Sequence, residues 1–335
     1  MAGKFINIDE VNQKLKENDM KVMYDAESTY RGQLFLLVQD ILKQKHLPQI
    51  ILLAGPSCAG KTTTARLIKE ILETKKKKAI IVSMDDFFLN RDETPLLPNG
   101  MKDFDSLRAL NLDQMEDCFK TLFENGEAGF PRFDFISGLN LPNEYYLKFD
   151  KDTIIIFEGL HALNPELIKH LGTDKFYSVY ADALKGFKRD NFYKISNRNL
   201  RLIRRMIRDY ARRGNSPEKT LKSWRNVCDA EDTYIAPYKE NANAFINTTH
   251  DFELALYKND FFEIVMENRE VIQDLPFLEI FEDSISLDKR KIPATSLMWE
   301  FVDPQEVEDE RDNKKAEANV AAEKEVKKSR CKKSK

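Results

Sequence analysis

Short apolar segments alternate with amphipathic ones along the first two thirds of the chain. Residues 49–54, 79–83 and 153–157 are almost wholly apolar, a pattern typical of strands that are buried on both faces of a parallel sheet. Residues 34–42 and 65–72 instead place apolar side chains at helical spacing, which predicts helices. Strand, helix and strand in this order predict a βαβ unit and an α/β fold with a parallel sheet.

The rest of the pattern extends this arrangement. Residues 112–123 return to helical periodicity, and residues 176–179 and 244–246 predict two further short strands. Residues 91–111 combine prolines, a glycine and charged side chains, so we expect a long loop there. Loops of this length often contain functional residues. The order of the strands in the sheet does not follow from one sequence.

A glycine-rich segment lies between the first predicted strand and the next helix. Residues 55–62, GPSCAGKT, have two glycines five positions apart, then a lysine and a hydroxyl residue, which is the phosphate-loop pattern. Backbone N–H groups of such a loop face phosphate oxygens, Lys61 adds positive charge, and Thr62 can bind Mg²⁺. The alternative, a turn that binds no nucleotide, is disfavoured by the flanking strand and helix. The predicted nucleotide-binding residues are Gly55, Pro56, Ser57, Cys58, Ala59, Gly60, Lys61, Thr62 and Thr63.

Acidic residues follow two of the predicted strands. Glu158 comes directly after strand 153–157, at the end where α/β sheets bind ligands, so we expect it to help hold Mg²⁺; the alternative is a structural carboxylate. Asp85 and Asp86 follow strand 79–83. One of them is expected to orient the acceptor hydroxyl and take its proton. We favour Asp85, while a turn role explains Asp86 equally well.

Residues 198–213 are unusually rich in arginine. Apolar side chains recur between the arginines at helical spacing, which predicts an amphipathic helix. A solvated helix face is one explanation, but beside a phosphate loop we favour a lid that clamps the transferring phosphate. For His161 and Cys58 we favour structural packing. The seven arginines are Arg198, Arg201, Arg204, Arg205, Arg208, Arg212 and Arg213.

Composition narrows the class of protein. The 335 residues are 42% hydrophobic and 33% charged with a net charge of −3, which predicts a globular protein and argues against a basic surface for nucleic acid. The sequence has no run of about 18 apolar residues and no secretory signal, so we expect a cytoplasmic protein that does not enter membranes. The four cysteines have no metal-like spacing. Residues 303–335, first acidic and then basic, predict a disordered tail, for which solvation is favoured over contact with nucleic acid.

Several motifs follow one another between residues 49 and 257: GPSCAGKTTT from Gly55, SMDDFF from Ser83, FDSLRALNLD from Phe104, FPRFDF from Phe130, FEGLHALNP from Phe157 and RLIRRMIRDYARRG from Arg201. With these motifs the sequence resembles the uridine kinase and phosphoribulokinase family of P-loop kinases, in particular the kinase portion of bacterial nucleoside kinases. This resemblance implies a three-layer α/β P-loop NTPase fold with a parallel sheet and a helical lid, and Mg²⁺-dependent phosphoryl transfer from ATP.

The resemblance also implies roles for individual residues. Asp85 would activate the acceptor hydroxyl, Asp105 would bind sugar hydroxyls, and Phe133 would flank the base. ATP-side roles are implied for Arg208, Arg213 and Asp251, and Arg205 would contact the substrate.

The sequence departs from uridine-cytidine kinases in the region that reads the base. Phe133 stands where tyrosine is usual, Gly138 for a base-reading histidine, Asn215 for an arginine and Ser223 for a glutamine. Because a lost hydrogen-bonding group no longer penalises the wrong base, we expect weak base discrimination.

The expected function is transfer of phosphate from ATP to the 5′-hydroxyl of a nucleoside, uridine first. The alternatives are a kinase for another small alcohol or sugar phosphate, as in phosphoribulokinase or pantothenate kinase, and an ATP-dependent regulatory protein associated with RNA. The expected division is a helical extension over residues 1–48, a kinase domain over 49–257, a helical extension over 258–302 and the tail. The sequence leaves the oligomeric state open.

Overall fold

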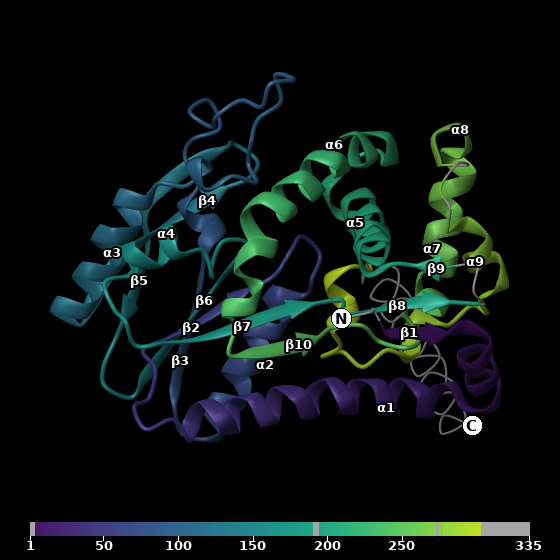
Figure 1. Ribbon diagram of the computed structural model, residues 1–335, viewed down its shortest axis with the longest axis horizontal. Coiled ribbons are helices and arrows are strands. Elements are labelled where there is room, and N and C mark those ends of the chain that lie inside the picture. Colours follow the sequence, from purple (N-terminus) through teal and green to yellow (C-terminus); the bar gives the residue numbers. More distant parts are fainter. Residues whose placement is uncertain (1–3, 190–193, 273–274, 276, 303–335) are drawn as a thin grey trace, which may run out of the picture.

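A five-stranded parallel sheet forms the centre of the protein, with strand order β10-β7-β2-β6-β3 (Figure 1). The computed structural model describes residues 4–189, 194–272, 275 and 277–302. The sheet confirms the α/β fold with parallel strands that the apolar segments predicted. Its strands are β2 (Ile50–Ala54), β3 (Lys78–Ser83), β6 (Thr153–Gly159), β7 (Phe176–Asp182) and β10 (Ala244–Asn247).

Alternate residues of the central strands belong to two separate apolar clusters, one on each face of the sheet. In β2, Ile51 and Leu53 join the first cluster, whereas Ile50 and Leu52 join the second. Every residue of β2 and of β6 is buried. Burial on both faces explains why these strands are apolar without alternation.

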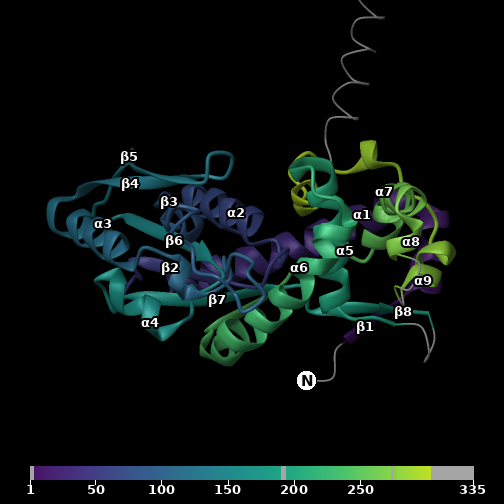
Figure 2. The same ribbon diagram turned by 90° about the horizontal axis from the view of Figure 1, so that it is seen from above.

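Helices cover both faces and so make three layers (Figures 1 and 2). The helices α1 (Ile8–Leu42) and α2 (Lys61–Thr74) contribute to the first apolar cluster. On the other face, α3 (Leu112–Asn125) and α4 (Pro165–Ile168) contribute to the second. The helices predicted from residues 34–42, 65–72 and 112–123 are therefore present, although the first begins much earlier than the pattern indicated and is interrupted by non-helical backbone at Asn18.

The arginine-rich helix is present as α5 (Asn197–Arg213), and α6 (Pro217–Ala230) follows it. The side chains of Ser196 and Ser216 each accept a backbone hydrogen bond at the start of their helix, which stabilises the helix N-terminus. Gly214 separates the two helices with a left-handed φ of 59°. The pair stands beside the carboxyl ends of the sheet strands, where the predicted lid belongs (Figure 1).

Two further β structures were not predicted. One is a small sheet in the order β1-β8-β9, made of β1 (Lys4–Asn7), β8 (Lys185–Lys188) and β9 (Lys194–Ile195). The other is an antiparallel hairpin of β4 (Glu127–Asp134) and β5 (Leu139–Lys148). Pro131 and Pro142 lie within the hairpin strands, and proline weakens a sequence-based strand assignment because it cannot donate a ladder hydrogen bond.

The segments expected as extensions share a core with the kinase region. The helices α7 (Glu253–Glu267), α8 (Arg269–Ile272) and α9 (Leu278–Asp283) contribute to the same apolar cluster as α1 and α2. The helix α7 crosses the predicted boundary at residue 257, and the residues on both sides of it belong to one apolar cluster. The division into a kinase domain over 49–257 and an extension over 258–302 stays a prediction. The tail predicted over 303–335 lies outside the described residues.

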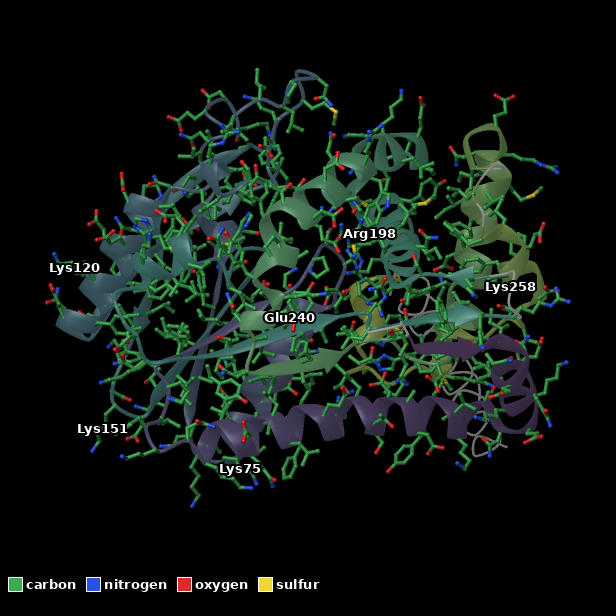
Figure 3. The ribbon with its side chains drawn as sticks, viewed as in Figure 1. Lys75, Lys120, Lys151, Arg198, Glu240 and Lys258 are labelled. Carbon is green, nitrogen blue, oxygen red and sulfur yellow. The ribbon has the colours of Figure 1, made fainter. Side chains whose placement is uncertain are left out.

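The surface is rich in charged side chains (Figure 3). Lys75, Lys120 and Lys151 are exposed and point outward from the helices and loops that bear them. Among the described helices, none combines the length and the apolar character needed to cross a bilayer.

Candidate active site

The predicted phosphate loop connects β2 to α2 and is held in a conformation that needs its glycines. A Cβ on Gly55 would lie 2.0 Å from the carbonyl oxygen of Ala181, so no larger residue fits there. Gly60 has a φ of 85°, the left-handed region that glycine adopts without strain. Lys61 is the first residue of α2, and its Nζ donates to the Pro56 carbonyl at 3.1 Å. The chain therefore presents the first turn of α2 as an anion site.

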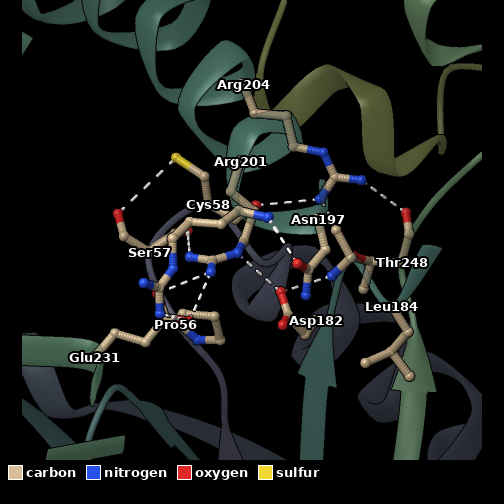
Figure 4. Close-up of polar contacts among 12 residues, drawn as sticks. Pro56, Ser57, Cys58, Asp182, Leu184, Asn197, Arg201, Arg204, Glu231 and Thr248 are labelled. Carbon is tan, nitrogen blue, oxygen red and sulfur yellow. Dashed lines mark hydrogen bonds and ion pairs between the residues drawn. The ribbon is translucent and has the colours of Figure 1, made fainter. Parts of the chain in front are cut away.

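Two fully buried arginines of α5 form hydrogen bonds with the backbone of this loop (Figure 4). Arg201 Nη1 donates to the Ser57 carbonyl at 3.3 Å, and Arg204 Nη1 donates to the Cys58 carbonyl at 3.1 Å. Carboxylates balance both charges: Arg201 pairs with Asp182 at 3.0 Å and with Glu231 at 2.8 Å, and Arg204 pairs with Glu253 at 2.6 Å. These two side chains therefore support the loop and do not line the cavity beside it, so only part of the arginine-rich helix can act as the predicted clamp.

A cavity of about 860 Å³ opens beside the loop and gathers most of the predicted site residues. It lies between the carboxyl ends of the strands, the lid helices and the loop after β3. This is the position that a parallel α/β sheet offers to ligands. The predicted residues that line it are Ser57, Cys58, Ala59, Lys61, Thr62, Asp85, Asp105, Phe133, Glu158, Arg205, Arg208 and Arg213.

Five predicted residues do not line the cavity. Gly55, Pro56, Gly60 and Thr63 belong to the loop and its helix but are absent from the cavity wall. Asp251 lies in the turn before α7 and also does not line the cavity. Its ATP-side role stays a prediction, because an adenine can extend beyond the cavity that encloses the phosphates.

Glu158 lines the cavity and is 7% exposed. Its Oε1 accepts hydrogen bonds from the hydroxyls of Thr62 and Ser83, each at 3.3 Å. Burial raises the pKa of Glu158 to about 7, although the charge of Lys61 opposes that shift. Carboxylate and hydroxyl oxygens side by side are the hard ligands that Mg²⁺ prefers, so Thr62 and Glu158 fit this cation.

Asp85 and Asp86 point in different directions although they are adjacent. Both belong to the 3-10 turn Met84–Phe87 after β3. Asp85 lines the cavity, where desolvation raises its pKa and the charges of Lys61 and Arg213 oppose the rise. Asp86 instead accepts a hydrogen bond at 3.0 Å from the hydroxyl of Tyr145 on β5. The geometry therefore favours Asp85 as the residue that faces an acceptor.

Asp105 reaches the cavity from the long loop that the sequence predicted over 91–111. Burial raises the pKa of its carboxyl group, and Arg205 opposes the rise. The buried His161 contacts this loop, with its Nε2 at 2.9 Å from the Asp105 carbonyl oxygen. Because burial lowers the pKa of His161 to about 4, the ring is neutral near pH 7. His161 fixes the loop, which agrees with the structural role favoured for it.

One carboxylate among the lid arginines escaped the sequence analysis. Asp209 is 2% exposed and pairs with Arg208 at 2.7 Å, with Arg205 at 3.4 Å and with Arg213 at 3.6 Å. These three are the arginines of α5 that line the cavity. A single buried anion thus orients them and offsets their mutual repulsion. The sequence could have predicted this role, because Asp209 lies four residues after Arg205 and four before Arg213. Side chains at this spacing pair on a helix.

The opposite end of the cavity is lined by aromatic rings. Phe88 lies 5.5 Å from Phe133 and 5.8 Å from Phe104, and Phe133 lies 5.1 Å from Phe135, all measured between ring centroids in edge contacts. Phe133 and Phe135 come from the unpredicted hairpin and its turn. Only Phe133 was predicted, because the other rings meet it through tertiary packing.

Comparisons with known proteins show which proteins this chain is similar to. The model of the "Phosphoribulokinase / Uridine kinase family" matches residues 50–255. The uridine kinase of Mycoplasma genitalium is 25% identical over 198 residues, 59% of this chain and 84% of that one. The uridine kinase of Bacillus pumilus is 27% identical over 200 residues, 59% and 86% of the two chains. A solved structure of a possible uridine kinase from Bacillus stearothermophilus shares 16% identity, matches 64% of this chain and 98% of that chain, and has a TM-score of 0.46.

The phosphate loop, the parallel sheet and the lid define a P-loop kinase. Because the family model covers more than half of the chain, the protein belongs to the phosphoribulokinase and uridine kinase family. The resemblance noted from the sequence motifs is thereby confirmed. Identities near one quarter leave the acceptor to be argued from the site.

Proposed function

We propose that the protein transfers the γ-phosphoryl group of ATP to the 5′-hydroxyl of a nucleoside, with uridine as the first candidate. The observation that supports this most is the meeting of Lys61, Asp85 and Asp105 in one cavity. A lysine charge at the phosphate end and a carboxylate facing the acceptor are the groups that phosphoryl transfer requires. The relatives named uridine kinase favour a nucleoside as the acceptor.

Asp85 is the proposed acceptor of the hydroxyl proton. Its raised pKa makes it a stronger base than an exposed aspartate, and the step needs a positioned oxygen more than a strong base. Arg208 and Arg213 line the same cavity and oppose the shift of the Asp85 pKa, so their charges act at the place where the phosphoryl group would move. There they would stabilise the charge that develops during transfer.

Thr62 and Glu158 are the proposed holders of Mg²⁺. When bound, this cation neutralises charge on the β- and γ-phosphates. A carboxyl group with a pKa near 7 must lose its proton to hold a cation, so cation binding and proton release at Glu158 are coupled.

A panel of acceptors tests the proposal. The purified protein is incubated with ATP, Mg²⁺ and each of uridine, cytidine, adenosine and guanosine, and ADP release is measured. Phosphorus NMR then shows whether the product is a 5′-monophosphate. We expect turnover with uridine that is absent from the Lys61→Ala variant. ADP release with none of the nucleosides, from a protein that binds ATP, would exclude the nucleoside assignment.

A sugar phosphate is the second candidate acceptor, because cationic side chains stand near the aromatic end. Arg91 lines the cavity and packs on Gly138, where a Cβ would lie 2.7 Å from its Cζ atom. Lys102 lines the cavity as well. A phosphorylated alcohol in the same panel distinguishes the two. If it is the substrate, Arg91→Gln should lower kcat/KM for it and leave any turnover of uridine unchanged.

A further inference from the structure

The described chain ends in a segment that packs directly against the phosphate loop. Residues 296–302, here called the C-terminal strap, include the 3-10 turn Leu297–Glu300. Leu297, Met298, Phe301 and Val302 of the strap are fully buried. A Cβ on Gly60 would lie 2.8 Å from Leu297 Cδ1, so the strap is in contact with the glycine at the start of α2.

The lid helix α5 fixes the strap at its other side. Arg212 Nη2 donates to the carbonyl oxygens of Trp299 and Val302, each at 2.6 Å. The guanidinium of the buried Arg204 lies 4.6 Å from the centre of the Phe301 ring. Buried apolar side chains and two backbone contacts leave the strap little freedom to move as a whole.

This anchored strap delivers a carboxylate to the phosphate end of the cavity. Glu300 lines the cavity, and its Oε2 accepts a hydrogen bond from the backbone N–H of Thr63 at 3.1 Å. Thr63 is the third residue of α2, so its N–H is one of the donors that a helix cannot satisfy internally. Burial raises the pKa of Glu158 to about 7, and the negative charges of Asp85 and Glu300 add to that shift. The charge of Glu300 therefore acts on the same site as Glu158.

A phosphate group and the Glu300 carboxylate require the same donor. In a phosphate loop the first N–H groups of the helix hold the α- and β-phosphates. One N–H cannot serve two anions, and two anions at one helix N-terminus repel each other. Glu300 lies outside residues 50–255, which the family model matches. The contact between Glu300 and Thr63 therefore joins the matched region to a segment that the family model does not include.

We propose that Glu300 sets the nucleotide affinity of the site by competing with nucleotide phosphate for the backbone N–H of Thr63. The inference rests on the ATP-binding part of the proposed function and is independent of the acceptor. Binding of ATP or ADP displaces the Glu300 side chain while the apolar residues of the strap stay in place. Glu300 thus acts as a built-in restraint on nucleotide binding.

The test is nucleotide binding by Glu300→Gln and Glu300→Ala, measured by calorimetry with ATP and with ADP in the absence of any acceptor. Glutamine keeps an oxygen that can accept the Thr63 hydrogen bond but removes the charge. Because a charge at a helix N-terminus changes free energies by about 1 kcal/mol, we expect Kd to fall by about fivefold in both variants. The matched control is Glu70→Gln, which removes one charge from the exposed side of the same helix.

The outcomes separate this inference from the proposed function. Tighter binding in both Glu300 variants, with Glu70→Gln unchanged, supports competition even if no nucleoside is phosphorylated. Unchanged or weaker binding in Glu300→Gln, with a normal melting temperature, would overturn it, because the carboxylate would then be only a helix cap or a ligand-supporting group. An NMR titration adds a second measurement: the Thr63 amide resonance should shift on ADP binding and on the Glu300→Gln substitution. If ADP leaves this resonance in place, the competition does not occur.

Discussion

The two ends of the cavity are built in different ways. At the phosphate end several charged groups have fixed partners: Arg201 and Arg204 donate to carbonyl oxygens of the loop, and Asp209 pairs with three arginines of the lid. At the acceptor end, which is the aromatic end of the cavity, the wall is formed largely by phenylalanine rings in edge contact, with Arg91 and Lys102 beside them. Charged and hydrogen-bonded groups have strict directional requirements, whereas a wall of aromatic rings accepts many flat ligands.

This difference separates the side chains proposed to carry out the reaction from those proposed to select the substrate. Under the proposed function, the phosphate end carries out the transfer of the phosphoryl group. The acceptor end then selects the molecule that receives this group, and its aromatic wall offers few hydrogen bonds. Substitutions at the phosphate end should therefore affect the rate strongly for every acceptor, while those at the acceptor end should change the ranking of acceptors.

The largest effect is expected at Lys61. Lys61→Ala should lower kcat by about 10³-fold or more with any acceptor, because the charge that stabilises the phosphates is lost. The melting temperature should stay within a few degrees of the parent value, since among the described residues the Lys61 side chain donates only to the Pro56 carbonyl. Lys69→Ala, on the exposed part of α2, is the control and should keep full activity. A folded Lys61→Ala enzyme with near-normal turnover would remove the phosphate end from the mechanism.

The next effect is expected at Asp85. Asp85→Asn should reduce kcat by about 10²-fold, the usual range for a group that transfers a proton, with the Kd for ATP largely kept. Asp86→Asn should instead lower stability, because Asp86 accepts a hydrogen bond from Tyr145 in the hairpin. Steady-state kinetics and thermal melting of the two variants distinguish these roles. The reverse pattern would make Asp86 the proton acceptor.

The same comparison explains how much the sequence predicted. The phosphate end was largely predictable, because the loop is one contiguous motif whose spacing follows from backbone geometry. Glu158 and Asp85 were selected because each lies within two residues of the end of an apolar strand, and both line the cavity. The acceptor end was not predictable, because Phe88, Phe104 and Phe135 meet Phe133 only through the packing of a loop on a hairpin.

Other features escaped prediction for a similar reason. The small sheet pairs β1 with β8 across most of the chain, and such distant pairing leaves no local pattern. The buried positions of Arg201 and Arg204 also depend on which face of α5 meets the phosphate loop. Helical periodicity predicted the helix. Because arginines are so dense along this helix, the pattern did not show which of them are buried.

A pH effect on stability is expected at Glu158. Its pKa in the folded protein is raised from 4.5 to about 7, so the folded state favours the protonated group. The protonated Glu158 carboxyl group therefore contributes fully to the free energy of unfolding below pH 4.5. This contribution is lost as the pH rises through about 7. Relative to Glu158→Gln, the parent protein should lose on the order of 2 kcal/mol between pH 5 and pH 8 without Mg²⁺.

Urea unfolding at the two pH values measures this effect. Asp150→Asn is a suitable control because hydrogen bonding from Lys78 and Thr153 lowers the pKa of Asp150 to about 2. Its contribution is present above pH 3.8 and is lost only as the pH falls through about 2, so it should not change between pH 5 and pH 8. Equal stability loss in the parent and Glu158→Gln would show that Glu158 does not titrate in this range.

The smallest effect is expected at the acceptor end, in the choice among nucleosides. Gly138 offers no side chain there, and Phe133, which is 4% exposed, has no hydroxyl to bond a base. Sites built around hydrogen bonds to the substrate discriminate by about 10⁴-fold or more, whereas apolar pockets reach only about 10²-fold. We therefore expect kcat/KM for uridine, cytidine and at least one purine nucleoside to agree within about 10²-fold. Phe133→Ala should lower kcat/KM for all of them together by removing the stacking surface, and strict preference for uridine in the parent enzyme would mean that a polar group outside these rings reads the base.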